Sequence, residues 1–228
     1  MWSFLLFLII FIESGFSPLS FIWSFFAINL LNCSISLLEI WIYAIITYII
    51  NGLFLELYPI KSTHSLELSF MMPQIVLNLS STFILTLFTL DNFTTSAEKA
   101  CYYLLIAGIG NELIYAPIHR ILHTRKLYKY HHLHHTQRIP RALGAIYCSL
   151  VEMWIANISS FILPLYFVRA PAIIFLIWIV SGIQTTQLHH SGKYYWWCFG
   201  NQPKFHHDHH FYITTNYGNL GFMEKILK

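Results

Sequence analysis

Histidines recur in this chain in three groups, and their spacing fits one face of a helix. In the first group His119 and His123 are four residues apart, and side chains four apart on a helix lie one turn above each other, with about 5–6 Å between Cβ atoms. An H-x-x-H-H pattern then occurs twice, at 131–135 and at 206–210. A single histidine is more often a structural residue than a ligand. Because three groups share a spacing that lets two imidazoles bind one ion, the pattern predicts a metal site.

The separation of these groups along the chain restricts the fold. Two apolar runs, 148–168 and 171–186, lie between the second and third groups, and each is long enough, or nearly so, to cross a bilayer. A chain that crosses twice returns to the face it left, so the histidines can meet on one side of the membrane. We therefore expect a transmembrane hairpin at about 148–186. It would belong to a histidine-box catalytic region at 100–228, preceded by N-terminal membrane spans at 1–99.

The composition supports a membrane protein. Of the 228 residues, 56% are hydrophobic and only 10% are charged, whereas a soluble domain has about 25% charged residues. Further apolar runs of nearly the length that a crossing needs occur at 37–55, 73–90 and 100–118, and residues 2–31 favour either one interrupted span or a short hairpin. We expect an all-α integral membrane protein, a helical transmembrane bundle of about four to six spans with a cytosolic histidine-rich helical cap.

One of these runs contains three consecutive hydroxyl residues, Ser80, Ser81 and Thr82. Hydroxyl side chains within a helix can donate a hydrogen bond to a carbonyl one turn earlier. We therefore expect these polar groups to be satisfied by their own helix.

Positive charge gathers beside the histidines. Six of the thirteen lysines and arginines lie between Arg120 and Arg141, and others lie beside the third group. Because basic residues next to membrane spans favour the cytoplasmic side, we expect the histidines to face the cytosol. These charges flank apolar spans and form no basic face on a soluble fold, which argues against nucleic acid as a partner. Four scattered cysteines, none in a C-x-x-C pair, indicate neither a disulfide framework nor a thiolate metal site.

The number of histidines indicates how many ions they bind. Imidazole suits Zn, Cu, Fe and Ni alike, so the residues alone do not select the metal. About nine well-spaced histidines are too many for one ion and suit two, each with an open position. Such a pair at a lipid boundary could activate oxygen or water, so hydrolysis of a lipid head group stays open. A non-enzymatic metal-binding or metal-transporting membrane protein is a further alternative, although a transporter should carry ionisable residues at mid-membrane and these spans carry mainly Ser, Thr and Asn.

Taken in order, the motifs resemble those of a known family. The sequence reads H-R-I-L-H at 119–123, H-H-L-H-H at 131–135, His190-Ser191-Gly192, H-H-D-H-H at 206–210 and Asn216-Tyr217-Gly218. This order is similar to that of the sterol desaturase/fatty acid hydroxylase superfamily of membrane di-iron oxygenases, and the likeness covers roughly residues 108–226. The last motif departs from the family pattern. Asp208 directly precedes His209, so that either His206 or His207 fits the ligand position.

The resemblance implies an enzyme and a set of ligands. By position in the motifs, the metal ligands would be His119, His123, His131, His134, His135, His190, His206, His209 and His210. Two irons, supplied with electrons from NAD(P)H through cytochrome b5 or a similar donor, would activate O2 to hydroxylate, oxidise or desaturate a membrane lipid. The motifs favour a sterol as substrate, a fatty acyl chain is the alternative, and an inactive relative would bind iron without turnover. Members of the family usually lie in the endoplasmic reticulum.

Further polar residues are expected to contact the ligands. Glu112 stands seven residues before His119, about two helical turns, and an isolated carboxylate in an apolar helix usually points at a partner. The alternative for Glu112 is a residue at the membrane interface. Glu152, near the start of the run that follows the second group, could also reach the site. The remaining candidates adjoin the motifs and are His132, His189, His207 and Asp208. Such neighbours orient ligating imidazoles in metal sites.

Overall fold

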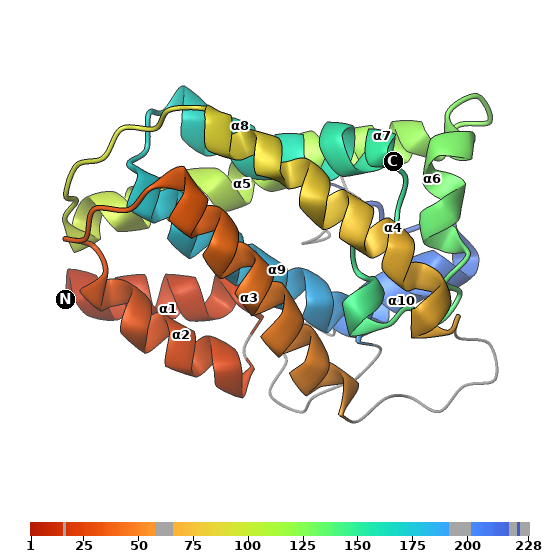
Figure 1. Ribbon diagram of the computed structural model, residues 1–228, viewed down its shortest axis with the longest axis horizontal. Coiled ribbons are helices and arrows are strands. Elements are labelled where there is room, and N and C mark those ends of the chain that lie inside the picture. Colours follow the sequence, from red (N-terminus) through yellow and green to blue (C-terminus); the bar gives the residue numbers. More distant parts are fainter. Residues whose placement is uncertain (16, 58–65, 192–201, 219–222, 224–228) are drawn as a thin grey trace.

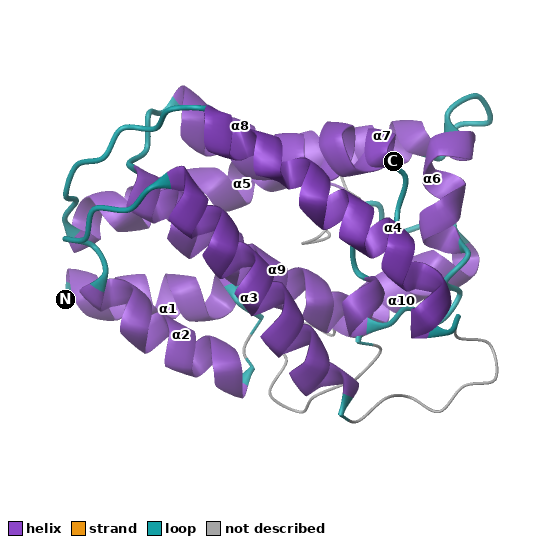
Figure 2. Cartoon of the chain, in the orientation of Figure 1, coloured by secondary structure: helices purple, strands orange, loops and turns teal. Residues whose placement is uncertain are grey.

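The chain is helical throughout the part that the structure describes. In the computed structural model these are residues 1–15, 17–57, 66–191, 202–218 and 223. Within those ranges every regular element is a helix and no strand occurs (Figure 2). The prediction of an all-α protein is confirmed. Gly192 of the H-S-G motif lies outside the described residues.

Five helical stretches of the described chain are long and apolar enough to cross a membrane. They are α3 (Leu37–Glu56), α4 with its continuation η1 (Leu68–Ser81, Thr82–Leu87), α5 (Ala97–Leu122), the run of α7, η3 and α8 (Leu150–Glu152, Met153–Ile158, Ser159–Phe167) and α9 (Ala172–His190). This number lies within the expected range. Helix α4 begins at Leu68 and not at residue 73, because Pro73 lies inside the helix. Membrane helices tolerate such a proline where neighbouring groups satisfy the carbonyl that it leaves without a partner.

Helix α9 is the centre of the bundle. It contacts α1 (Trp2–Glu13), α3, α5, α8 and α10 (Gln202–Tyr212), and its side chains are buried along most of its length. The apolar side chains of α9 are spread around its whole circumference, which is typical of a helix enclosed by others. Figure 1 shows it running through the middle of the molecule toward α10.

The N-terminal residues form a hairpin, one of the two arrangements that the sequence left open. Helices α1 and α2 (Pro18–Asn29) have 12 residues each, about 18 Å of helix, which is less than the roughly 30 Å of a bilayer core. The turn between them lies against the C-terminal part of α9. Gly15 has a φ of 82°, and a Cβ atom there would lie 2.8 Å from Cδ2 of Leu188. The Thr185 hydroxyl donates to the carbonyl of Glu13. The hairpin therefore supports the end of α9 that carries His190.

The expected return of the chain to one end of the bundle is visible in Figure 1. The C-terminal end of α5 leads to α6 (Tyr128–His135), and α9 contacts α10 near its own C-terminus. The hairpin of α8 and α9 joins these elements, so histidines far apart in sequence approach one another. The division of the chain at residue 100 into two regions stays a prediction.

Amide side chains attach α4 to the loop before α7. Asn78 is completely buried, and its Nδ2 donates to the carbonyls of Ile146 at 2.7 Å and Cys148 at 2.9 Å. The Nε2 atom of Gln74 donates to the same Cys148 carbonyl at 2.9 Å. In a low-dielectric interior an unpaired carbonyl is costly, so these bonds fix one side of α4.

We expect the substitution Asn78→Leu to destabilise the fold. It removes two buried hydrogen bonds, each of which contributes about 0.5–1.5 kcal/mol net, and each kcal/mol lowers the melting temperature by about 2–4 °C in a chain of this size. Thermal unfolding in detergent measures the shift. Asn29→Leu is the matched control, because the exposed Asn29 amide donates only to a carbonyl of its own helix. Equal melting temperatures for the two variants would contradict the role of Asn78.

Candidate metal centre

Nine histidines converge at one end of the bundle in two groups. Group 1 contains His119, His123, His131, His135 and His209, and group 2 contains His134, His190, His206 and His210. One nitrogen atom from each member lies within 4.8 Å of those of every other member of its group. These are the nine residues that the motifs singled out, and the structure brings all of them together.

The H-x-x-H-H pattern has a geometric meaning in this arrangement. In α6, His131 and His135 are four residues apart and both enter group 1, whereas His134 enters group 2. In α10 the roles are exchanged, so that His206 and His210 enter group 2 and His209 enters group 1. Each helix therefore supplies a pair to one group and a single imidazole to the other. The two groups are in direct contact, since the ring centroid of His135 in group 1 lies 4.9 Å from that of His210 and 5.7 Å from that of His134, both in group 2.

Backbone carbonyls fix the outward nitrogen of four of these rings. The Nδ1 atoms and their acceptors are His119 with Tyr217 at 2.7 Å, His190 with Thr186 at 2.7 Å, His209 with Thr215 at 2.6 Å and His210 with Gln137 at 2.8 Å. A carbonyl oxygen only accepts, so each Nδ1 must carry the proton. The Nε2 atom of each ring then has a lone pair, which points into the group. This is the arrangement that orients imidazole ligands in metal sites.

The inward nitrogens face one another at distances that call for a cation. The Nε2 atoms of His119 and His131 lie 2.9 Å apart, and that of His206 lies 3.0 Å from both His190 and His210. His206 could donate a proton to only one of its two neighbours. Nitrogen lone pairs at this separation repel unless a positive charge lies between them, and imidazole is a ligand for Fe, Zn, Cu and Ni. Both groups therefore fit a bound divalent metal ion.

Burial keeps the imidazoles neutral. It lowers the pKa of His209 to about 4, and burial together with the nearby His209 imidazole lowers the pKa of His123 to about 3. The pKa values of His134, His206 and His210 are lowered well below the usual histidine range, first by burial and then by neighbouring imidazoles. Only a neutral imidazole can bind a metal ion, so the centre is in its ligating form at neutral pH.

Glu152, the last residue of α7, contacts a histidine of group 1. Its Oε1 lies 2.9 Å from Nδ1 of His131, and its backbone N–H is capped by the Ser149 hydroxyl at 3.2 Å. The Ser149 hydroxyl in turn donates to the carbonyl of Tyr130 in α6. Directly after Glu152 the chain forms the π-helix η3, a rare conformation that is frequent at functional sites. Glu152 thus lies beside a candidate ligand, where the sequence suggested that it could reach.

Glu112 lies against the N-Y-G motif. Its carboxylate occupies the space next to Gly218 where a Cβ atom would have to fit. The preceding residue, Tyr217, provides the carbonyl that accepts from His119. Glu112 is completely buried, which argues against an interfacial position. Glu112 therefore acts on the candidate ligand His119 indirectly, through the backbone of Tyr217 and Gly218.

The other predicted neighbours differ in position. His189 is buried beside His206, with 6.4 Å between ring centroids, and His207 is half-buried, and both lie outside the two groups. His132 is exposed, and Asp208 pairs with Lys204 on the surface of α10. Of the two alternatives left open for the last motif, the structure brings His206 into group 2.

Some contributors have no signature in the sequence. The carbonyls of Gln137, Thr186 and Thr215 orient imidazoles, but any residue type can provide a carbonyl. Gln137 also holds its own turn, because its Nε2 donates to the carbonyl of Gly144 at 2.9 Å. The only available signal was position, since Gln137 follows the second histidine pattern by two residues.

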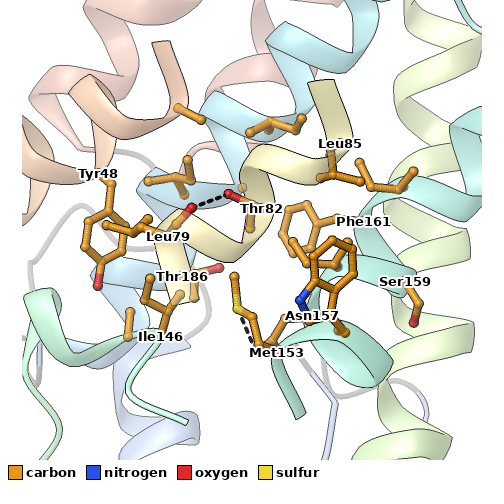
Figure 3. A pocket seen from close by; sticks show the side chains of 18 of the residues that line it. Tyr48, Leu79, Thr82, Leu85, Ile146, Met153, Asn157, Ser159, Phe161 and Thr186 are labelled. Atoms are coloured by element: carbon orange, nitrogen blue, oxygen red, sulfur yellow. Dashed lines mark hydrogen bonds between the residues drawn. The ribbon is translucent and has the colours of Figure 1, made fainter. Parts of the chain in front are cut away.

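An apolar cavity of about 500 Å³ adjoins group 2. It lies between α3, the α4–η1 stretch, α8 and α9, and its walls are mostly aliphatic and aromatic (Figure 3). His134, His190 and His206 line it, whereas no group 1 histidine does among the described residues. The candidate metal centre therefore opens through group 2 into a space within the membrane-spanning part of the molecule.

Comparison with known proteins identifies the family. The model of the fatty acid hydroxylase family matches residues 104–228, more than half of the chain. A fatty acid hydroxylase of Mycosarcoma maydis is 27% identical over 134 residues, which is 58% of this chain and 34% of the relative. A very-long-chain aldehyde decarbonylase of Oryza sativa subsp. indica is 27% identical over 138 residues, 57% of this chain and 50% of the relative. A methylsterol monooxygenase of Arabidopsis thaliana is 26% identical over 140 residues, 58% of this chain and 50% of the relative.

The chain spans half or less of the length of these curated relatives. No solved structure matches it. The family match and the relatives agree with the order of the histidine motifs. The chain therefore belongs to the fatty acid hydroxylase family, a family of lipid-modifying oxygenases and oxidoreductases within the sterol desaturase/fatty acid hydroxylase superfamily.

Proposed function

We propose that this protein is a di-iron, O2-dependent enzyme that oxidises a C–H bond of a membrane lipid, with a sterol as the expected substrate and a fatty acyl chain as the alternative. The observation that carries the proposal is the position of group 2. Its neutral imidazoles border an apolar cavity inside the membrane-spanning helices. The relatives support both substrate classes, because their names include a fatty acid hydroxylase and a methylsterol monooxygenase.

The protein would hold two ions with unequal numbers of ligands. Group 1 offers five imidazoles and group 2 offers four, so group 2 leaves more room for a ligand that is not protein. When bound, two irons would supply the electron-transfer chemistry by which O2 is reduced and a C–H bond is oxidised. The polypeptide holds the imidazoles in place. The four Nδ1–carbonyl bonds and the Glu152–His131 contact keep the donor nitrogens turned inward.

The cavity would hold the lipid and exclude water. Along α9 its lining runs from Phe175 to His190, about 22 Å of helix, so an extended lipid can lie along the bundle with one end at group 2. Few polar side chains interrupt the lining. Within the part of the chain that the structure describes, Nδ2 of Asn157 donates to two sulfur atoms, Cys148 Sγ at 3.7 Å and Met153 Sδ at 4.0 Å. Because these are weak acceptors, this amide could bind a hydroxyl or carbonyl group of the lipid.

The proposal includes a location and an electron donor. We expect the metal centre to face the cytosol at the endoplasmic reticulum membrane, with electrons delivered from NAD(P)H through cytochrome b5 or a similar protein. Arg120, Arg125, Lys126 and Lys129 are exposed next to group 1. Such a basic surface favours an acidic docking partner and speeds its association.

Product analysis tests the function. Membranes that contain the metal-loaded protein, NAD(P)H and an electron donor are incubated with isotope-labelled methylsterols and fatty acids, and the products are identified by mass spectrometry. We expect oxygenated or desaturated products of the sterol, because the motifs are closer to those of sterol-modifying members. Oxidation of the fatty acid alone would assign the alternative substrate. Absence of any product that depends on both O2 and NAD(P)H would refute the enzyme assignment.

A pair of adjacent substitutions tests the ligand assignment. We expect His206→Ala to lose iron from group 2 and to abolish turnover, because it removes a central donor nitrogen. We expect His207→Ala to retain both ions, since His207 lies outside the groups. Metal content by mass spectrometry on purified protein measures both. The opposite result, with iron lost only from His207→Ala, would show that the ligand is His207.

The metal-free protein should lose stability in acid. The pKa of His209 is about 4 in the folded chain and about 6.5 when unfolded. As the pH falls below about 6.5, the unfolded chain binds protons that the folded chain does not. The contribution of His209 to stability is therefore fully present above about pH 6.5 and is lost as the pH falls to about 4. Melting temperatures of chelator-treated protein across this range check the slope. His209→Gln should reduce the slope, because it removes one of the groups that binds a proton only in the unfolded chain.

A further inference from the structure

Two tryptophans hold the same turn of the α4–η1 stretch. The indole Nε1 of Trp154 donates to Oγ of Ser81 at 3.2 Å, and that of Trp41 donates to Oγ1 of Thr82 at 3.1 Å. Trp41 belongs to α3 and Trp154 to η3, so two different elements reach two consecutive residues. The turn is the point where α4 ends and the 3₁₀ helix η1 begins.

The two hydroxyls accept these bonds because their own protons are already used. Ser81 Oγ donates to the carbonyl of Asn78 at 2.8 Å, and Thr82 Oγ1 donates to that of Leu79 at 2.6 Å. Figure 3 shows the Thr82 bond next to the cavity. A hydroxyl has one proton and two lone pairs, so each oxygen remains an acceptor for an indole. The sequence predicted such bonds to the helix carbonyls, and for these two residues the prediction is confirmed.

Hydrogen bonds, more than burial, fix η1 in its place. None of its six residues is buried. Besides the Thr82 bond, Phe83 packs against Trp41 of α3, with the two ring centroids 5.1 Å apart and the ring planes at 78°. A segment that packs so little against the rest of the protein is held in its place mainly by its specific polar contacts. Its position therefore depends on the two indoles.

The η1 segment forms the far end of the lipid cavity. Leu85 and Phe88 line it, and the carbonyl of Asp91, shortly after η1, accepts from the backbone N–H of Ala172 at 2.8 Å. Ala172 is the first residue of α9, whereas His190 is the last. Leu85 and Phe88 therefore lie toward the end of the cavity opposite to group 2.

We propose that Trp41 and Trp154 determine which lipids the cavity accepts, by holding the Ser81–Thr82 turn and thereby fixing the wall that limits lipid length. Both tryptophans also line the cavity, and we expect them to act on length as positioning residues, through Leu85 and Phe88. Substitution of Ser81, which does not line the cavity, removes the Trp154 hydrogen bond without changing the volume of an indole. The inference rests on the proposed function in one respect, since it takes the cavity as the lipid site. It assigns no step of the reaction to either indole.

The chain provides a matched control for the loss of an indole hydrogen bond. Trp23 Nε1 donates to Ser181 Oγ at 3.1 Å, which is the same pairing of groups at nearly the same distance. That bond joins α2 to α9 and does not involve a residue that lines the cavity. Any effect of Trp→Phe that comes only from general loosening should therefore appear at Trp23 as well.

The test measures lipid binding and turnover separately. Purified wild-type protein, Trp41→Phe, Trp154→Phe and Trp23→Phe are titrated in detergent with a series of saturated fatty acids from tetradecanoic to docosanoic acid. A second series contains sterols that differ only in side-chain length. We expect the ratio of affinities for long over short members to rise about fivefold in the Trp41 and Trp154 variants, the effect of one lost hydrogen bond, and to stay unchanged in Trp23→Phe. Ser81→Ala and Thr82→Val remove the acceptors and should give the same shift, which decides the matter if a tryptophan variant does not fold.

The outcomes separate this inference from the proposed function. A shift in binding selectivity without turnover in any protein would support the length wall and refute the oxygenase. Turnover with an unchanged length ratio in all four cavity variants would refute the length wall alone. An equal shift in Trp23→Phe would attribute the effect to general loosening, and failure of the wild type to bind either series would overturn the proposal.

Discussion

The direction of the imidazole rings is the constraint on which the rest of this molecule depends. Four Nδ1–H groups are held by backbone carbonyls, and a fifth ring, that of His131, faces Glu152. Each such contact turns an Nε2 lone pair inward. The acceptors lie at the ends of elements or in the loops that follow them, at Gln137, Thr186, Thr215 and Tyr217. Thr186 belongs to α9 itself, and the other three acceptors follow α6 or α10, so the segments after these two helices help to decide whether the candidate ligands converge.

The membrane-spanning part serves this geometry. Helix α9 is enclosed by its neighbours and brings His190 to the same end as α6 and α10. The short N-terminal hairpin abuts the last turns of α9 at Leu188, and Asn78 ties α4 to the loop that precedes Glu152. Apolar contacts set the positions of the helices in the bundle. A few polar contacts set the axial position of the segments that carry or adjoin the candidate ligands.

Sequence alone predicted the spans and the nine histidines, because apolar length and helical spacing are local properties. It placed the start of α4 at Pro73, since a proline usually begins or breaks a helix, and the structure places Pro73 inside. It could not choose between His206 and His207, because both satisfy a spacing rule and only the packing of α10 against α9 distinguishes them. The carbonyl acceptors, the π-helix after Glu152 and the convergence of Trp41 and Trp154 on one turn were inaccessible for the same reason. Each depends on tertiary contacts between segments that are distant in the sequence.

Helix α6 gives two histidines to group 1 and one to group 2, and α10 does the reverse, which has a consequence for how metal ions would be bound. Each of these helices contributes to both groups, through His134 in one and His209 in the other. Neither group can reach its full complement of nitrogens while either helix is displaced. If the two groups bind metal ions, occupancy of one would therefore favour occupancy of the other, and molecules with a single ion would be scarce at equilibrium.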